Sequence, residues 1–283
     1  MILLLAELGW VKYGKGISKM WILLLVISIL TSFAGSICGI GGGIILKPVL
    51  DFIGVADVST ISFLSSCVVL SMSLYSVVRT VASSDKNSDI DWSISIPLAI
   101  GAALGGVLGR SLFRLTTSTI KTELVTGIQA ISLAVLTIAS LIYTLKRDRI
   151  SNYEIRNKVV CFIIGLALGV MSSFLGIGGG PINLVALYFF FSMNSKTAAG
   201  NSLFIILVSQ LSGLTTQFIT GAIPDFKWLW LTVMVAGGFL GGIVGRRLNK
   251  SFSEKNVRQL FICLLVIIIA INFGVVLKSF FLF

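Results

Sequence analysis

Residues 39–43 read Gly-Ile-Gly-Gly-Gly, and residues 176–180 repeat these five letters. An apolar run precedes each copy, Trp21–Ile37 before the first and Val159–Leu175 before the second. Each run is long enough to cross hydrocarbon as a helix, which needs roughly 20 residues. Glycines inside such runs expose backbone N–H and C=O groups, which a membrane tolerates only where the backbone is buried in protein or lines a watery cavity. The pattern predicts membrane helices with two internal breaks.

The composition also indicates a membrane protein. The 283 residues are 56% hydrophobic and 12% charged, and their mean hydropathy is +1.02. A soluble domain carries about a quarter charged residues, so this chain lacks the polar groups that would cover a soluble surface. A β-barrel is excluded, because its strands would alternate polar and apolar residues over about ten positions. We predict an all-α, multi-pass integral membrane protein of the cell membrane.

Hydropathy predicts eight long helices and two short ones. The long helices are expected at 19–38, 59–83, 92–113, 121–145, 156–175, 196–220, 227–248 and 257–281. The short pieces, 44–54 and 181–192, follow the two breaks. At 1.5 Å per residue neither is long enough to span alone. Each is expected to pair with the preceding helix as a broken or re-entrant element.

Three sequence blocks recur in the same order in both halves of the chain, at offsets of 137, 136 and 136. They begin at Gly39 and Gly176, at Ser59 and Ser195, and at Gly105 and Gly241. This duplication predicts one membrane domain in four parts: an interfacial segment (1–18), repeat 1 (19–147), a basic linker (148–155) and repeat 2 (156–283). Inverted and parallel repeats both remain open, with inverted repeats slightly preferred because transporters use them.

Glycines in the third block recur every four residues, which places them on one helix face. They are Gly101, Gly105 and Gly109 in the first half, and Gly237, Gly241 and Gly245 in the second. Small residues on a helix face allow close backbone approach. Static helix packing is preferred here over a sliding surface or a dimer contact, and a homodimer stays a possible partner.

Four clusters of basic residues lie in the connections between the predicted helices. They are Lys12–Lys19, Arg110–Lys121, Lys146–Lys158 and Arg246–Arg258. The positive-inside rule would place all four in the cytoplasm, yet two of them flank the single helix predicted at 121–145. Either one cluster is external or that helix is irregular. Membrane orientation explains the net charge of +11, so we expect no nucleic-acid partner.

The chain has no histidine, and its four cysteines lie in apolar runs without a CxxC pair. The commonest metal ligand and the usual proton shuttle are therefore missing. An enzyme needs a nucleophile–base pair or a metal site. We expect no metal, no cofactor and no enzymatic activity, and the positive charge favours an anionic substrate.

A helix that starts in mid-membrane presents unpaired N–H groups and the positive end of its dipole. Pro181 suits the first position of such a helix after the second break. Two such ends that converge would form an anion site near the midplane. The expected partners are thus a small anionic substrate and the lipid bilayer around the protein. The repeated break therefore predicts the substrate site.

Polar side chains near the breaks complete this predicted site. Asn201 fits a substrate contact and an interhelical hydrogen bond equally well, whereas packing is preferred for the serines. Lys47 either supplies positive charge or extends to the interface near Asp51. The candidate substrate-binding residues are Gly39, Gly41, Gly42, Gly43, Lys47, Ser65, Ser66, Gly176, Gly178, Gly179, Gly180, Pro181, Asn183, Asn201 and Ser202.

These motifs resemble the TauE/SafE-type sulfite and sulfonate exporters, also called the 4-toluene sulfonate uptake permease family. The resemblance starts at about residue 19 and rests on the duplicated unit. It rests also on Gly39–Gly43 with Lys47-Pro48 downstream, on Gly176–Gly180 with Pro181, and on the Lys-Thr-Ala-Ala-Gly-Asn-Ser-Leu of residues 196–203. In place of the family's usual Gly-Thr-Ser, this chain has Leu64-Ser65-Ser66, so the two half-sites are not equivalent.

The resemblance implies secondary transport of sulfur oxyanions or organosulfonates such as sulfite, without an ATPase. We therefore predict a carrier that moves a small anion by rocking one repeat against the other. An anion channel built from the same elements is the alternative, and a membrane scaffold protein is a weaker one.

Overall fold

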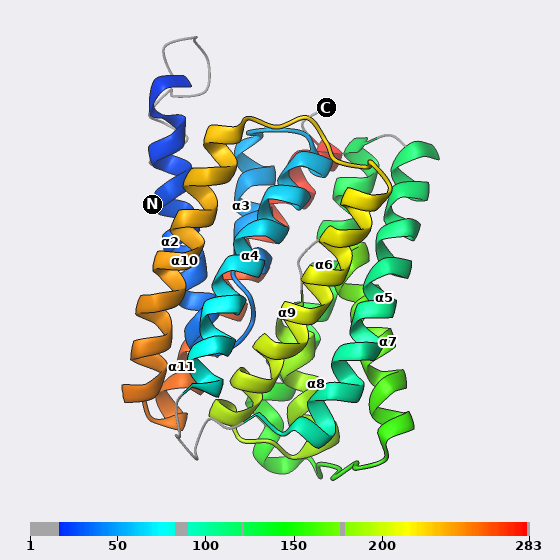
Figure 1. The fold of residues 1–283 in the computed structure, drawn as a ribbon, viewed down its shortest axis with the longest axis vertical. Helices are drawn as coiled ribbons and strands as arrows, with labels where there is room; N and C mark the ends of the chain where they lie inside the picture. The colour runs from blue at the N-terminus through cyan, green and yellow to red at the C-terminus, as the bar shows by residue number, and fades with distance from the viewer. Residues whose placement is uncertain (1–16, 83–89, 120–121, 176–178, 282–283) are drawn as a thin grey trace.

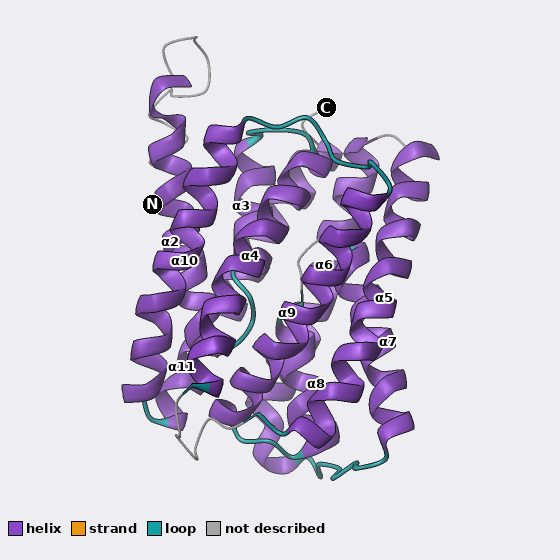
Figure 2. Cartoon of the chain, viewed as in Figure 1, coloured by secondary structure: helices purple, strands orange, loops and turns teal. Residues whose placement is uncertain are grey.

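The computed structural model describes residues 17–82, 90–119, 122–175 and 179–281. These residues form a bundle of helices with no strand (Figures 1 and 2). The helices are α2 (Ile17–Cys38), α3 (Gly43–Ile53), α4 (Val58–Val81), α5 (Trp92–Thr119), α6 (Thr122–Lys146), α7 (Lys158–Phe174), α8 (Pro181–Phe191), α9 (Ser195–Ile219), α10 (Trp228–Ser251) and α11 (Glu254–Phe281). A 3-10 turn, η2 (Arg147–Arg149), follows α6. Within the described ranges, seven helices are long and apolar enough to cross a membrane, which confirms the predicted fold class.

The helix that begins the second half is shorter than predicted. α7 has 17 residues and is not among the seven candidate spans. The chain before it runs extended along the end of α8, where Tyr153 N donates to Phe189 O at 2.8 Å and Ile155 N donates to Phe190 O at 2.9 Å. The side chain of Asn157 then caps α7. These contacts hold residues 153–157 outside the helix, so it starts later than hydropathy alone suggests.

The first glycine break lies at half the height of the bundle, as the loop between α2 and α3 in Figure 2 shows. Gly39 and Gly41 have φ of +77° and +67°, a left-handed conformation that glycine adopts without strain. Gly42 packs so closely against α2 that an added Cβ would lie 2.9 Å from Thr31 O. The chain thus reverses, and α3 returns toward the end where α2 began (Figure 1). This confirms the predicted re-entrant element.

α8 also begins inside the bundle and runs back toward the end where α7 started (Figure 1). Ile40 and Ile44 from the first re-entrant element share one buried apolar cluster with Leu184 and Leu187 of α8. Both short helices have 11 residues, within one residue of the predicted lengths. The two re-entrant elements therefore pack into a common core.

Corresponding helices of the two halves run in opposite directions. In Figure 1, α2 starts at the top of the bundle and α7 at the bottom. α4 and α9 are antiparallel, since Phe63 contacts Phe218 with ring centroids 6.4 Å apart while Met72 and Val77 cluster with Leu203. Inverted repeats would have these directions. The duplication itself stays a prediction from the sequence.

The two glycine stripes join helices of opposite halves. A Cβ added at Gly105 of α5 would lie 2.1 Å from Leu166 O of α7. A Cβ added at Gly241 of α10 would lie 2.4 Å from Ile29 O of α2. The stripes therefore hold α5 against α7 and α10 against α2, which is the close helix packing that the four-residue spacing predicts.

Basic residues of two clusters meet at one end of the bundle. Arg147 Nη2 donates to Met193 O at 2.7 Å, and Arg258 Nη2 donates to Thr144 O at 3.0 Å. We call this the basic end. α6 is an uninterrupted helix, so the segment before it lies at the opposite end. The two clusters that flank α6 therefore lie at opposite ends of the bundle, and the start of α2, where the cluster Lys12–Lys19 ends, also lies opposite the basic end.

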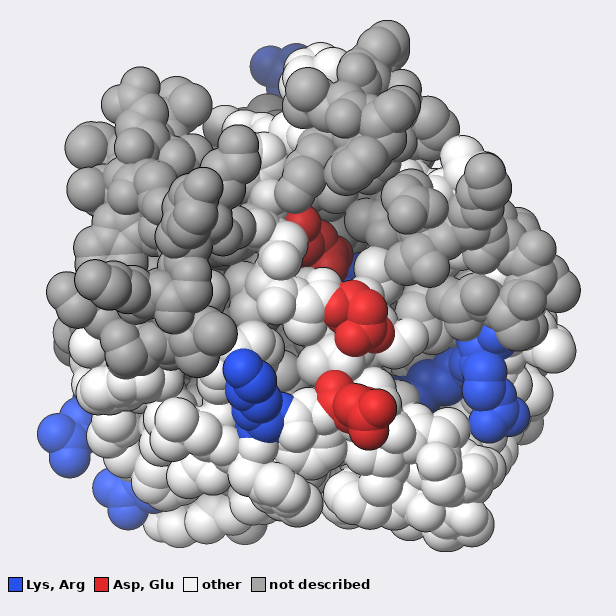
Figure 3. All heavy atoms as spheres, turned by 90° about the horizontal axis from the view of Figure 1, so that it is seen from above, with Lys and Arg blue, Asp and Glu red and all other residues white. Residues whose placement is uncertain are grey.

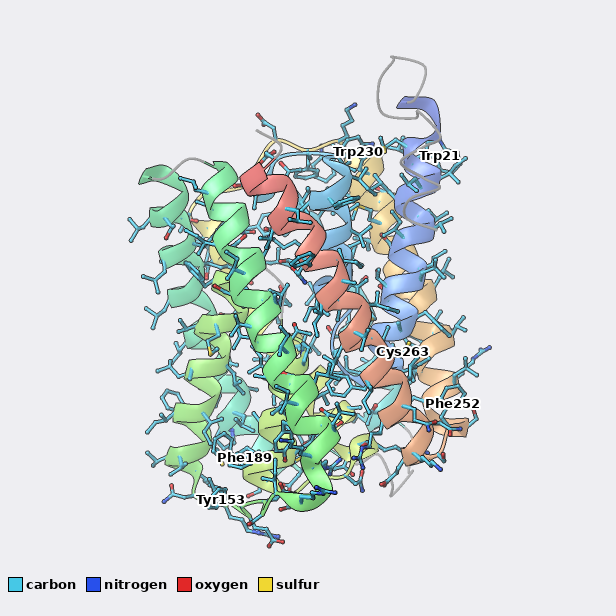
Figure 4. The ribbon with its side chains drawn as sticks, turned by 180° about the vertical axis from the view of Figure 1, so that it is seen from behind. Trp21, Tyr153, Phe189, Trp230, Phe252 and Cys263 are labelled. Carbon is cyan, nitrogen blue, oxygen red and sulfur yellow. The ribbon has the colours of Figure 1, made fainter. Side chains whose placement is uncertain are left out.

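The opposite end is acidic at its centre, as Figure 3 shows. There the α3–α4 and α9–α10 connections touch, since Thr60 Oγ1 donates to Asp57 Oδ1 at 2.6 Å and lies 3.1 Å from Asp225 O. Figure 4 places Trp21 and Trp230 near this end and Tyr153 and Phe189 at the basic end. Aromatic residues at two levels are typical of the two membrane–water interfaces.

Candidate functional site

Both glycine breaks lie against one face of α9. A Cβ added at Gly39 would lie 2.3 Å from Ala199 Cα, and a Cβ added at Gly179 would lie 2.5 Å from Ile206 Cγ1. Seven residues separate these two contacts, which is two helical turns and about 10 Å along the same face. The structure thus brings the two breaks together, whereas Gly176 and Gly178 lie outside the described residues.

Ser202 lies on this face of α9, between the two contacts. Its side chain is 0% exposed, and within the described ranges its hydroxyl oxygen has no hydrogen-bond partner. The same holds for Ser65 on α4, which is 1% exposed. Buried polar groups are almost always hydrogen-bonded. The hydroxyl of Ser202 beside the breaks, and that of Ser65 on α4, which packs against α9, are therefore donors available to a ligand.

The backbone at the second break and the start of α8 requires glycine. Gly179 and Gly180 have φ of +117° and +115°, and Pro181 is the first residue of α8. Asn183 follows in the first turn and is buried. α3 begins likewise at Gly43 after Gly42. Both short helices thus direct the positive ends of their dipoles into the bundle.

Asn201 is bound within the protein. Its Oδ1 accepts hydrogen bonds from Asp91 N at 2.9 Å and from Ser95 Oγ, and its Nδ2 donates to Thr197 O at 2.7 Å. These bonds join α9 to the first turn of α5. Of its two predicted roles, the contacts fit the interhelical hydrogen bond, and a substrate contact stays a prediction.

Lys47 forms a buried ion pair. Its Nζ lies 3.2 Å from Asp51 Oδ2 and 2.9 Å from Gln129 Oε1, and the two charged side chains are 4% and 6% exposed. Of the two roles expected for Lys47, free positive charge or extension to the interface, the ion pair confirms neither. Spacing i,i+4 on α3 brings the two charges to one face, where each compensates the other.

The same pair reaches the end of α7. Gln129 Nε2 donates to Phe174 O at 2.6 Å, just before the second break. The ion pair thus connects α3, α6 and α7. Its net charge is zero, so Lys47 is a poor source of free positive charge for a substrate.

Two arginines that the sequence places in basic clusters lie instead within the bundle. Arg110 Nη2 donates to Ser66 Oγ at 3.1 Å and to Gln210 Oε1 at 3.2 Å, so α4, α5 and α9 meet at this guanidinium. Arg246 Nη1 donates to Asn249 Oδ1 at 3.3 Å. Arg110, Gln210, Arg246 and Asn249 are absent from the predicted site. The signal for the arginines was the Gly-rich third block, which ends in arginine in both halves.

A surface cavity of about 290 Å³ lies at the basic end. Polar and charged residues from three segments line it, among them Asp91, Glu154, Arg156, Asn194 and Thr197. Thr197 lies one turn before Asn201, and Ser202 follows directly. The cavity therefore lies at the start of the helix that contacts both breaks.

Comparison with known protein families gives a match over most of the chain. The family model for the sulfite exporter TauE/SafE matches residues 23–272. The chain belongs to the TauE/SafE family. This TauE/SafE protein is a multi-pass membrane transporter of the cell membrane.

Similar proteins carry transporter names. The chain is 25% identical over 265 residues to the probable membrane transporter protein YunE of Bacillus subtilis (strain 168), across 88% of this chain and 95% of YunE. It is 27% identical over 255 residues to the probable membrane transporter protein MJ0441 of Methanocaldococcus jannaschii, across 83% and 89% of the two chains. No solved structure matches the chain. The relatives' names specify transport without a substrate.

Proposed function

We propose that this TauE/SafE protein is a secondary transporter of small anions, of the class of sulfur oxyanions and organosulfonates such as sulfite, and that it performs no covalent chemistry. The observation that carries the proposal is the convergence of both breaks on one face of α9, beside unused buried hydroxyls. Family membership supports transport, and the resemblance described above supports the substrate class.

The chemistry around the breaks favours an oxyanion. Sulfite and sulfonates present several acceptor oxygens with negative charge. Ser65 and Ser202 offer hydroxyl donors, and the starts of α3 and α8 offer backbone N–H groups and positive dipole ends. In a site that excludes water these interactions are stronger than in solution. These groups are donors and positive dipole ends, so they favour an anion over a neutral or cationic solute.

The packing suggests how the site opens to alternate sides. α2, α4 and α10 pack as one group, and α5, α7 and α9 pack as another. Each group contains helices of both halves, and α4 meets α9 at the seam between the groups. Ser65, Ser66 and Ser202 lie on the helices at that seam. We infer that rocking of these two groups exposes the site, a refinement of motion between whole repeats.

The test is flux into proteoliposomes that contain the purified protein. We expect saturable uptake of radiolabelled sulfite, thiosulfate or a small sulfonate, measured with and without a pH gradient. Gly179→Leu should abolish it, because its side chain would collide with Ile206. Gly221→Leu is the matched control, since Gly221 also has a positive φ, of +63°, but no atom within 4 Å of an added Cβ.

Each result of this assay has a defined meaning. Saturable flux that the Gly179 variant loses and the Gly221 variant retains supports a carrier with its site at the break. Single-channel steps in planar bilayers, with flux far above carrier turnover, would favour the anion channel instead. Folded protein that moves none of the three anions contradicts the proposed substrate class.

A further inference from the structure

Arg110 lies where three helices meet. Besides its bonds to Ser66 and Gln210, its guanidinium packs directly on α9 at Gly213, where an added Cβ would lie 2.3 Å from Nε and 2.8 Å from Cζ. A side chain at position 213 would displace the guanidinium. The backbone of α9 and two neutral side chains therefore hold this cation in place.

The charge of Arg110 has no counter-ion in the described part of the chain. The ion pair found there joins Lys47 to Asp51, and no described carboxylate lies within 4 Å of the Arg110 guanidinium. Its Nε is buried and has no hydrogen-bond partner among the described residues. A buried charge that lacks a partner is strongly unfavourable, and ionisable groups inside membrane bundles commonly serve substrates. An anion would remove this penalty.

The position of Arg110 connects it to the second break. Gly109, its neighbour in the chain, packs against the last turn of α7, where an added Cβ would lie 3.1 Å from Phe174 N. Gln210, which accepts from Arg110, lies one turn beyond Ile206, the residue that Gly179 contacts. The guanidinium thus lies along the same face of α9 as Ser202 and the two breaks.

The corresponding arginine of the other half has different surroundings. Arg246 donates to Asn249 of its own helix, and Asn249 Nδ2 donates to Ile37 O at 2.6 Å, at the end of α2. Arg110 bonds instead to side chains of two other helices, α4 and α9. The two guanidinium groups therefore have different partners, and Arg110 is the one that packs on α9, the helix that contacts both breaks.

We propose that Arg110 binds the transported anion directly and makes the site selective for oxyanions. The unpartnered Nε–H donates to one oxygen of the sulfur oxyanion or sulfonate, because both N–H groups of Nη2 already donate to Ser66 and Gln210. The guanidinium charge attracts the remaining oxygens. Ser66 and Gln210 orient the guanidinium, and Gly213 makes room for it. This inference rests on the proposed function and names the residue that supplies its positive charge.

Two variants and one control test the role of Arg110 in proteoliposome flux. Arg110→Gln removes the charge, Arg110→Lys keeps the charge without the Nε–H donor, and Arg114→Gln changes an exposed arginine one turn further along α5. We expect KM for sulfite to rise about tenfold or more in Arg110→Gln, as for loss of a charge-assisted hydrogen bond. Arg110→Lys should show a smaller rise, and Arg114→Gln should retain the KM of the wild type.

A binding measurement separates this inference from the proposed function. In detergent, sulfite should raise the thermal unfolding midpoint of the wild type and of Arg114→Gln but not that of Arg110→Gln. If the wild-type protein transports none of the tested anions, the proposed function is contradicted. The shift of the unfolding midpoint with sulfite would still test whether Arg110 binds the anion. If folded Arg110→Gln has the KM of the wild type, and sulfite raises its unfolding midpoint as much as that of the wild type, the inference is overturned. Where Arg110→Gln does not fold, Arg110→Lys decides: a raised KM supports the inference, and a wild-type KM overturns it.

Discussion

Single glycines at the breaks satisfy two separate requirements. Gly39 has a φ of +77°, which side-chain-bearing residues adopt only with strain, and it also touches the backbone of α9 at Ala199. The first requirement concerns the turn and the second the approach of a neighbouring helix. Gly221 has only the first, because its φ is +63° but nothing lies within 4 Å of an added Cβ.

Gly39→Ala should therefore destabilise the protein more than Gly221→Ala. Left-handed strain of about 1–2 kcal/mol applies to both, and the collision with Ala199 adds overpacking of about 1–3 kcal/mol at Gly39 alone. Thermal unfolding in detergent measures the difference. Equal losses of stability in the two variants would show that only the turn requires glycine at position 39 and that its contact with α9 does not affect stability.

The buried pair of Lys47 and Asp51 allows a second prediction. Lys47→Met leaves a carboxylate without its cation, which typically costs about 3–5 kcal/mol. The double variant Lys47→Met/Asp51→Asn removes both charges and should regain most of that loss. Thermal unfolding of both variants checks this, and a double variant less stable than Lys47→Met would contradict it.

The glycines of the breaks and the serines of the candidate site were predicted from sequence because they lie in blocks that recur, and Pro181 because proline suits the first position of a helix. The buried charges were not. Hydropathy assigns charged residues to the ends of spans, whereas the partners that hold Arg110 inside the bundle lie 44 and 100 residues away, at Ser66 and Gln210. Such contacts arise only when α4, α5 and α9 assemble.

At the scale of helices, periodicity and length were sufficient for most of the structure. The short helices α3 and α8 begin at or one residue from their predicted starts, because glycines and a proline mark them. The start of α7, predicted at residue 156, lies at Lys158 because the side chain of Asn157 accepts hydrogen bonds from Val159 N and Val160 N and caps the helix there. Hydropathy carries no information on those bonds.

The glycine stripe on α5 leads to a prediction for the contact between helices. Gly105→Ala places a Cβ 2.1 Å from Leu166 O, and this carbonyl oxygen belongs to the backbone, so α7 must move. We expect a loss of about 1–3 kcal/mol from overpacking. Gly274→Ala is the matched control in α11, since its nearest atom is Cε2 of Phe52 at 3.3 Å.

The control variant should be neutral or slightly stabilising, because alanine favours a helix over glycine by up to about 1 kcal/mol. Thermal unfolding and the elution profile in detergent compare the two variants. If Gly105→Ala were as stable as Gly274→Ala, the stripe would not be a tight contact between α5 and α7.

At the scale of the whole molecule, the distribution of charge predicts the orientation in the membrane. The basic end carries Arg147, Lys196 and Arg258, and the opposite end has acidic residues at its centre (Figure 3). The positive-inside rule then places the basic end in the cytoplasm. The surface cavity of about 290 Å³ would face the cytoplasm as well.

Single cysteines test this orientation in cells that express the protein. In a Cys263→Ser background, which removes the exposed native cysteine, Thr220→Cys should react with a membrane-impermeant maleimide in intact cells. Ser151→Cys, at the basic end, should react only after permeabilisation. The reverse pattern would show that the basic end is external.

The most direct test of a substrate site on α9 is to locate a bound anion. Selenite, the selenium analogue of sulfite, gives an anomalous X-ray signal, so crystals of the protein grown with selenite would reveal its position. We predict an anomalous peak beside α9 between Ser202 and Gln210, within hydrogen-bonding distance of Arg110. A peak found only at the ends of the bundle, in protein that transports sulfite, would contradict a central site formed by the two glycine breaks.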